Sequence, residues 1–221
     1  GTYNMDSRES EFMTYEAIKY GYRHIDTAAV YKNEDGVSRA LERIFNETQL
    51  KREDIFITTK LWPGGLIKLD RVRDYKDTLK SFEKSLMRLN LEYIDLYLIH
   101  SPHGKSKRIE QWKSLMNLKE SGKVKYIGVS NWGINHINEL KENNLPLPDA
   151  NQIEIHPWSQ KPELVKYLRE NDIDIIAYSS LVPLSSWRHK DGENSKKTDE
   201  MYKLGESENS PFRLLAQKYN C

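Results

Sequence analysis

Short apolar segments alternate with longer amphipathic segments along most of the chain, and this alternation limits the folds open to it. The short segments are rich in β-branched and aromatic residues, while apolar residues in the long ones recur at helical spacing. This order is typical of βαβ units, which build a parallel sheet covered by helices. We predict six strands, over residues 22–28, 55–61, 94–100, 124–130, 150–155 and 173–179.

The amphipathic segments between these strands predict the covering helices. In the segment 74–89, four apolar residues fall on one helix face: Leu79, Phe82, Leu86 and Leu89. We expect a last helix to start at Pro211 with Ser210 as its N-cap, because serine is a favoured cap and proline fits the first turn. The other helices are expected over 9–20, 34–45, 109–121, 134–143 and 162–171.

Two architectures are compatible with this order of elements. An open doubly wound sheet accepts six parallel strands, but its dinucleotide site is usually marked by a glycine-rich turn after the first strand, and the chain has no G-x-G-x-x-G. A closed eight-stranded barrel has the same rhythm and places its chemistry at the carboxyl ends of several strands. The polar residues at the strand ends therefore decide between the two.

The composition favours one domain over residues 1–221, with a polar, mobile loop at 182–209. Lys and Arg number 34 against 33 Asp and Glu, and the net charge of +1 gives no general attraction to nucleic acid or acidic membranes. Cys221 is the single cysteine, and no apolar run reaches the roughly 18–20 residues that span a bilayer. We expect a cytoplasmic monomer without nucleic-acid or membrane partners.

Three consecutive predicted strands carry a charged or titratable side chain at or near their carboxyl ends. These residues are Asp26, Lys60 and His100. Buried parallel strands normally read as continuous apolar runs, so polar residues at successive strand ends are expected to converge on one mouth of a barrel. Tyr31 follows five residues after Asp26, on the loop above the same mouth. The four side chains predict one site.

This combination of groups suits the reduction of a carbonyl. A tyrosine can donate a proton to a developing alkoxide when a nearby ammonium favours its phenolate, and Lys60 can provide that ammonium. Asp26 would hold Lys60 in place and charged, while His100 would hydrogen-bond the carbonyl oxygen and orient it. No metal is required for this chemistry.

Several motifs then resemble one enzyme family over essentially the whole chain. The segment from Gly21 to Ala28, followed by Tyr31 and Asn33-Glu34, is similar to the signature of the aldo-keto reductases. The resemblance continues through Thr59-Lys60-Leu61-Trp62, Asp95 to His100, Gly122-Lys123-Val124, Ile127 to Asn131, Asn151 to Glu154 and Ala177-Tyr178-Ser179. It implies a (β/α)8 TIM barrel in which Asp26, Tyr31, Lys60 and His100 form the catalytic tetrad.

The same resemblance implies a cofactor site and a substrate pocket. The cofactor is expected to be NADPH, with NADH as a second possibility, and the expected contacts are Thr2, Asp26, Ser130, Asn131, Gln152, Tyr178, Ser179 and Leu181. The substrate is expected to be a small aldehyde or ketone, in a pocket formed by Tyr31, Trp62, His100 and Ser101. Ser101 stands where many members have a tryptophan, which would remove a large wall from the pocket.

The chain also departs from the family pattern at both ends. Members have most of a first strand before a pair such as Gly1-Thr2 and an eighth strand after the last helix, so we expect a fragment of a barrel. The eighth strand normally holds the adenosine 2'-phosphate, and its absence leaves the preference for NADPH resting on the resemblance. Two functions are consistent with these features: an active reductase of the NADP+-dependent alcohol dehydrogenase type, or a catalytically weak barrel that binds a cofactor or regulates a partner.

Overall fold

A computed structural model describes residues 1–67, 69–157, 159–180, 203 and 207–220. The chain forms two compact units. The first combines Gly1–Ile153 with Glu163–Ile176, and the second combines Glu154–Pro162 with Ala177–Cys221. Most of the polar segment predicted as a loop at 182–209 lies outside the described residues.

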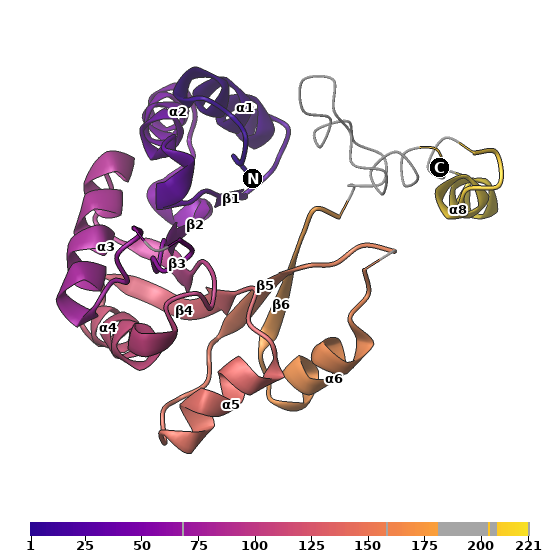
Figure 1. Ribbon diagram of the computed structural model, residues 1–221. Helices are drawn as coiled ribbons and strands as arrows, with labels where there is room; N and C mark the ends of the chain where they lie inside the picture. The colour runs from indigo at the N-terminus through magenta and orange to yellow at the C-terminus, as the bar shows by residue number, and fades with distance from the viewer. Residues whose placement is uncertain (68, 158, 181–202, 204–206, 221) are drawn as a thin grey trace. The chain divides into compact units, whose positions relative to one another are not determined.

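Six parallel strands follow one another in sequence order across a single sheet (Figure 1). They are β1 His24–Asp26, β2 Phe56–Leu61, β3 Ile94–Ile99, β4 Val124–Ser130, β5 Ala150–Glu154 and β6 Asp174–Tyr178. A doubly wound sheet reverses its strand order at a switch point, whereas this order advances in one direction throughout. The sheet is therefore a parallel β/α half-barrel, which confirms the barrel architecture over the open sheet.

The observed strands lie within the predicted ones, and the largest difference is at β1. This strand has three residues, although its ladder continues at both ends through hydrogen bonds from Phe56 N to Arg23 O (2.7 Å) and from Thr27 N to Thr58 O (2.9 Å). The chain turns away after Thr27 into the short 3-10 helix η1, Ala29–Tyr31. The remaining strands end within one or two residues of their predicted limits.

Seven α-helices accompany the strands in the part of the chain that the structure describes. They are α1 Ser7–Lys19, α2 Glu34–Glu47, α3 Tyr75–Leu89, α4 Arg108–Glu120, α5 Ile134–Glu142, α6 Pro162–Glu170 and α8 Pro211–Tyr219. Helix α1 begins two residues before its predicted start, because Asp6 accepts hydrogen bonds from Arg8 N and Glu9 N and forms a capping box with Glu9. Ser210 caps α8 as predicted, accepting a hydrogen bond from Arg213 N. None of these helices has the length and apolar character needed to cross a bilayer.

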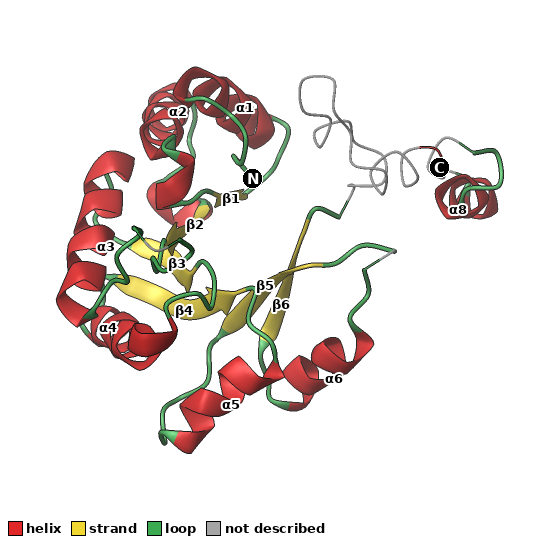
Figure 2. Ribbon diagram, in the orientation of Figure 1, coloured by secondary structure: helices red, strands yellow, loops and turns green. Residues whose placement is uncertain are grey.

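The two faces of the sheet have different roles in the first unit. Helices α1 to α4 cover the outer face of β1 to β4 (Figure 2), where the ring of Tyr97 lies 5.1 Å from that of Phe82 on α3. Leu96 and Leu98 alternate with Tyr97 along β3, and they pack on the inner face with Ala150. Lys60 pairs with Leu98 in the β2–β3 register, so its side chain also points to the inner face.

Gly128 lies where β4 closely approaches its two neighbouring strands. It pairs with Leu98 on one side and Ala150 on the other, and a Cβ at this position would lie 2.4 Å from Ala150 O and 2.7 Å from Leu98 Cδ2. Only a residue without a side chain fits here, so Gly128 sets how closely β4 and β5 pack.

We expect Gly128→Ala to lower the free energy of unfolding by about 1–3 kcal/mol, because the methyl group forces β4 and β5 apart. Denaturant titration measures the loss. Gly133→Ala is the matched control, since Gly133 has a negative φ and its nearest neighbour is 3.9 Å from a built Cβ; it should cost less than about 1 kcal/mol. Equal stability of the two variants would contradict the close approach.

Candidate active site

The structure brings the four predicted catalytic side chains together at the carboxyl end of the first three strands. Asp26 ends β1, Lys60 lies one residue before the end of β2, and His100 directly follows β3. Lys60 Nζ donates to Asp26 Oδ1 at 2.6 Å and lies 5.1 Å from the centre of the Tyr31 ring. The rings of Tyr31 and His100 meet edge to face, 5.5 Å apart. One cluster therefore holds all four groups.

Lys60 is a buried cation, and its partners explain how the fold accommodates it. Its side chain is only 1% exposed, and Nζ donates a second hydrogen bond to Thr27 O at 2.9 Å. Burial lowers the pKa of the Lys60 ammonium, and the carboxylate of Asp26 opposes that shift. An unpaired charge at this depth would be very costly, so Asp26 is what allows a charged lysine here.

His100 is held as a neutral imidazole. Burial, and then the positive charge of Lys60, lower its pKa to about 4, while Asp26 acts in the opposite direction. Its Nδ1 is buried and makes no hydrogen bond within the described residues. At neutral pH the ring therefore carries one N–H, which can donate to a single acceptor such as a carbonyl oxygen.

Three further polar side chains line the ends of β4 and β5 in the same unit. Ser130 Oγ donates to Gln152 O at 2.9 Å, and Asn131 Nδ2 donates to Ser130 Oγ and to His100 O, both at 3.1 Å. Gln152 Nε2 donates to Asp26 Oδ2 at 2.8 Å. These contacts join the predicted cofactor residues Ser130, Asn131 and Gln152 directly to the catalytic cluster.

Asn131 also adopts an unusual backbone conformation, with φ of 62°. Asparagine tolerates this left-handed region better than most residues. Its N–H donates to Gln152 O at 2.9 Å, so the strained turn is held by the neighbouring strand. Such positions are common at functional sites, where a turn must aim a side chain in one direction.

Thr2 lies beside the cluster and is held by Asn33, which was predicted only as part of a sequence motif. Its N–H donates to Asp26 O at 3.0 Å, and its hydroxyl donates to Asn33 Oδ1 at 3.2 Å. Asn33 is fully buried; its Nδ2 donates to Thr2 O and Met5 O, and its Oδ1 also accepts from Thr27 Oγ1. Asn33 thus fixes the loop that carries Tyr31, a role its polarity alone did not indicate.

Aromatic rings stand around the catalytic groups. The indole of Trp62 meets His100 edge to face at 5.9 Å. Tyr3, which the sequence interpretation missed, lies 5.2 Å from the ring of Tyr31. Its position directly after Thr2 was the available signal. Ser101 is buried, and its hydroxyl oxygen is not accessible to solvent.

The remaining predicted cofactor residues belong to a different part of the chain. Tyr178 and Ser179 lie in the second unit, where Tyr178 O accepts a hydrogen bond from Ile155 N at 3.4 Å. Leu181 lies outside the described residues.

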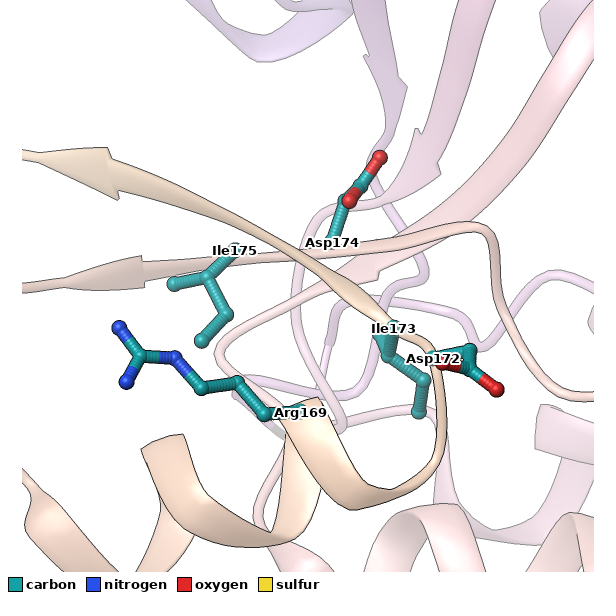
Figure 3. Close-up of a pocket in the computed structure, with 5 residues that line it drawn as sticks. All are labelled: Arg169, Asp172, Ile173, Asp174 and Ile175. Atoms are coloured by element: carbon teal, nitrogen blue, oxygen red, sulfur yellow. The ribbon is translucent and has the colours of Figure 1, made fainter.

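A cavity of about 390 Å³ lies away from this cluster, at the turn from α6 into β6 (Figure 3). Its lining residues are Arg169, Asp172, Ile173, Asp174 and Ile175. Asp174 is the first residue of β6, so the cavity lies at the amino end of the sheet. Barrel chemistry is found at the carboxyl ends of the strands, which makes the Asp26 cluster the candidate site.

Comparison with known proteins links this geometry to one family. The aldo/keto reductase family model matches residues 1–221. The chain is 44% identical to glyoxal reductase of Bacillus subtilis over 75% of this chain and 56% of that protein. It is 41% identical to an uncharacterized oxidoreductase of Schizosaccharomyces pombe over 82% of this chain and 63% of that one. It therefore spans about three fifths of the length of these relatives.

A solved structure shares the fold as well. The crystal structure of a Bombyx mori aldo-keto reductase in complex with NADP is 31% identical, with a TM-score of 0.78 over 98% of this chain and 68% of that chain.

The low pKa of His100 predicts a loss of stability in acid. The folded state keeps the imidazole neutral down to about pH 4, while the unfolded chain protonates it near 6.5, so stability falls as pH drops through this window. Between pH 7.5 and 5 we expect this group to remove roughly 2 kcal/mol from the free energy of unfolding.

Urea unfolding at both pH values measures the effect. Between pH 7.5 and 5, the free energy of unfolding of His100→Asn should fall by about 2 kcal/mol less than that of the unaltered chain. His103→Asn is the control, because the His103 side chain is exposed on the adjacent loop, and it should behave as the unaltered chain does. The same acid loss in His100→Asn and the unaltered chain would show that the imidazole is not held neutral.

Proposed function

The chain belongs to the aldo/keto reductase family, and from this premise we propose that it reduces aldehydes or ketones to alcohols with a nicotinamide cofactor. The observation that carries the proposal is the buried Lys60–Asp26 ion pair directly beside Tyr31 and His100. It combines a phenol, an ammonium and a neutral imidazole in one place. Together these groups can donate a proton, stabilise the phenolate that remains and orient a carbonyl oxygen.

Tyr31 is the proposed proton donor. As the carbonyl carbon accepts hydride, negative charge develops on its oxygen, and the Tyr31 O–H bond breaks while the alcohol O–H bond forms. The phenolate left behind lies next to the ammonium of Lys60, whose Nζ is 5.1 Å from the ring centre. The positive charge favours that phenolate, and Asp26 keeps the ammonium charged and in place.

His100 is proposed to orient the substrate. Because its pKa is about 4, the ring is neutral at pH 7 and offers a hydrogen bond without carrying a charge of its own. A donor fixed near Tyr31 holds the carbonyl oxygen where the phenol can reach it. Trp62, Tyr31 and Tyr3 are proposed as the walls around the substrate, with Ser101 beside His100.

The polar ends of β4 and β5 suit a nicotinamide. A carboxamide has both a donor and an acceptor, and the hydroxyl of Ser130 and the amides of Asn131 and Gln152 offer both within one cluster. When bound, the nicotinamide supplies the hydride. We propose NADPH, supported by the NADP complex of the Bombyx mori relative. Thr2, Tyr178, Ser179 and Leu181 complete the proposed cofactor contacts by family resemblance.

We expect Tyr31→Phe to lower kcat on the order of 10²–10⁴-fold, because no other group replaces the phenol as proton donor. NADPH binding, measured by fluorescence titration, should change little, since the ring remains. The assay is reduction of an aromatic aldehyde followed by NADPH absorbance. Tyr20→Phe is the matched control, because Tyr20 is 83% exposed on the surface, and it should retain full turnover.

Each alternative outcome has a definite meaning. Normal turnover by Tyr31→Phe would exclude Tyr31 as the donor. Saturable NADPH binding by the unaltered chain without turnover of any aldehyde would favour the second candidate, a barrel that binds a cofactor and does little chemistry.

A further inference from the structure

In the loop between β2 and α3, the described residues 62–67 and 69–74 are joined by several hydrogen bonds. Arg73 N and Gln111 Nε2 both donate to Pro63 O, at 2.9 and 3.1 Å, which closes the base of the loop. Above the base, Gly65 N donates to Asp70 O at 2.9 Å. Gly64 has a φ of 77°, and a Cβ there would lie 2.1 Å from a backbone oxygen. These hydrogen bonds tie both ends of the loop to its base.

Trp62, the first residue of the loop, is hydrogen-bonded to Asp70, which lies later in the same loop. The indole Nε1 donates to Asp70 Oδ2 at 2.8 Å, and the centre of the indole lies 5.9 Å from that of the His100 ring, with an interplanar angle of 86°. Rotation about the bond to an aromatic ring is only weakly restricted by the side chain itself. A hydrogen bond to a carboxylate is among the strong ones, so Asp70 fixes the direction of the ring.

The side chain and the backbone of Asp70 have separate tasks. Its backbone holds the loop: the Asp70 N–H donates to Ile67 O, and the Asp70 C=O accepts from Gly65 N. Its carboxylate accepts the hydrogen bond from Trp62 and also lies 3.6 Å from Arg73 Nη1. That ion pair is long and partly exposed, and such pairs contribute little. A substitution of the side chain can therefore remove the Trp62 contact while the loop keeps its main-chain bonds.

We propose that Asp70 is a positioning residue for substrate selection: by fixing the Trp62 indole edge-on to His100, it maintains an apolar wall that selects aldehydes with an aromatic ring beside the carbonyl. This inference rests on the proposed reductase function. A fixed indole offers a large flat apolar surface at a low cost in conformational entropy, and the rings of Tyr31 and Tyr3 extend the aromatic surroundings. Small aliphatic aldehydes gain little from such a wall.

The experiment compares 4-nitrobenzaldehyde with propanal in four variants of the chain. Asp70→Leu removes the acceptor, Asp70→Asn keeps one, Trp62→Phe removes the donor, and Leu69→Ala alters the neighbouring residue, which is 94% exposed. For Asp70→Leu we expect KM for the aromatic aldehyde to rise about tenfold, with kcat for both aldehydes within about twofold. Asp70→Asn should restore most of the affinity, and Leu69→Ala should match the unaltered chain.

A double variant tests whether Asp70 acts through Trp62. In the Trp62→Phe background the indole donor is gone, so adding Asp70→Leu should change KM for the aromatic aldehyde by less than about twofold. A full further loss in that background would overturn the proposal. So would an equal loss of activity toward propanal, because it would show that Asp70 supports the whole site rather than one wall.

A spectroscopic measurement separates this inference from the proposed function. The Trp62 indole N–H signal in a ¹H–¹⁵N spectrum is identified by its loss in Trp62→Phe, and Asp70→Leu should move it to the shift of a weaker hydrogen bond. If the unaltered chain reduced neither aldehyde, the reductase proposal would be refuted, but the spectroscopic measurement could still be made. In that case the change of the signal in Asp70→Leu shows whether Asp70 holds the indole. Addition of 4-nitrobenzaldehyde to the unaltered chain, followed by the same signal, shows whether the Trp62 wall binds an aromatic ring. No shift in either experiment would refute the inference.

Discussion

The ion pair between Lys60 and Asp26 is the interaction on which the site depends. Removing one partner from a buried pair leaves an uncompensated charge, which is far more damaging than the pair is stabilising. Asp26 also accepts a hydrogen bond from Gln152 on β5, while Lys60 is bonded to the backbone at Thr27. The same carboxylate therefore joins the ends of β1, β2 and β5. The Lys60–Asp26 ion pair therefore sets the charge beside Tyr31, the proposed proton donor, and also fixes how these strands are arranged.

The alternation of segments predicted a parallel β/α architecture, and the polar residues at the strand ends favoured a barrel over an open sheet. Each strand of the half-barrel lies within its predicted range, and the polar ends of β1, β2 and β3 indicated the site, because charged groups are rarely placed at the end of a buried strand without a function or a partner. The ladder contacts at Arg23 and Thr27 lie within the predicted strand 22–28, whereas the early start of α1 was not predicted, since it depends on individual hydrogen bonds to Asp6. Element limits are sensitive to such single contacts.

The supporting contacts of the site could not be predicted in the same way. Asn33, Tyr3 and Asp70 occupy loops, and their roles depend on side-chain directions that no periodic pattern specifies. Asn33 bonds to Thr2, 31 residues away, and Asp70 reaches back over its own loop to Trp62. The left-handed turn at Asn131 also could not be predicted, because it is held by a hydrogen bond from Asn131 N–H to Gln152 O on the neighbouring strand. The sequence indicated the groups proposed to react, while the groups that hold them became visible only in the structure.

The strand order also has a consequence for how the protein forms. Each strand pairs with the next one along the chain, so the sheet can grow stepwise from its amino-terminal edge as the polypeptide leaves the ribosome. The bond between Gln152 and Asp26 is different, since it joins residues 126 positions apart. Contacts of such separation carry a large loop-closure cost and form late. A nascent chain can therefore acquire much of its secondary structure before it has a working catalytic centre.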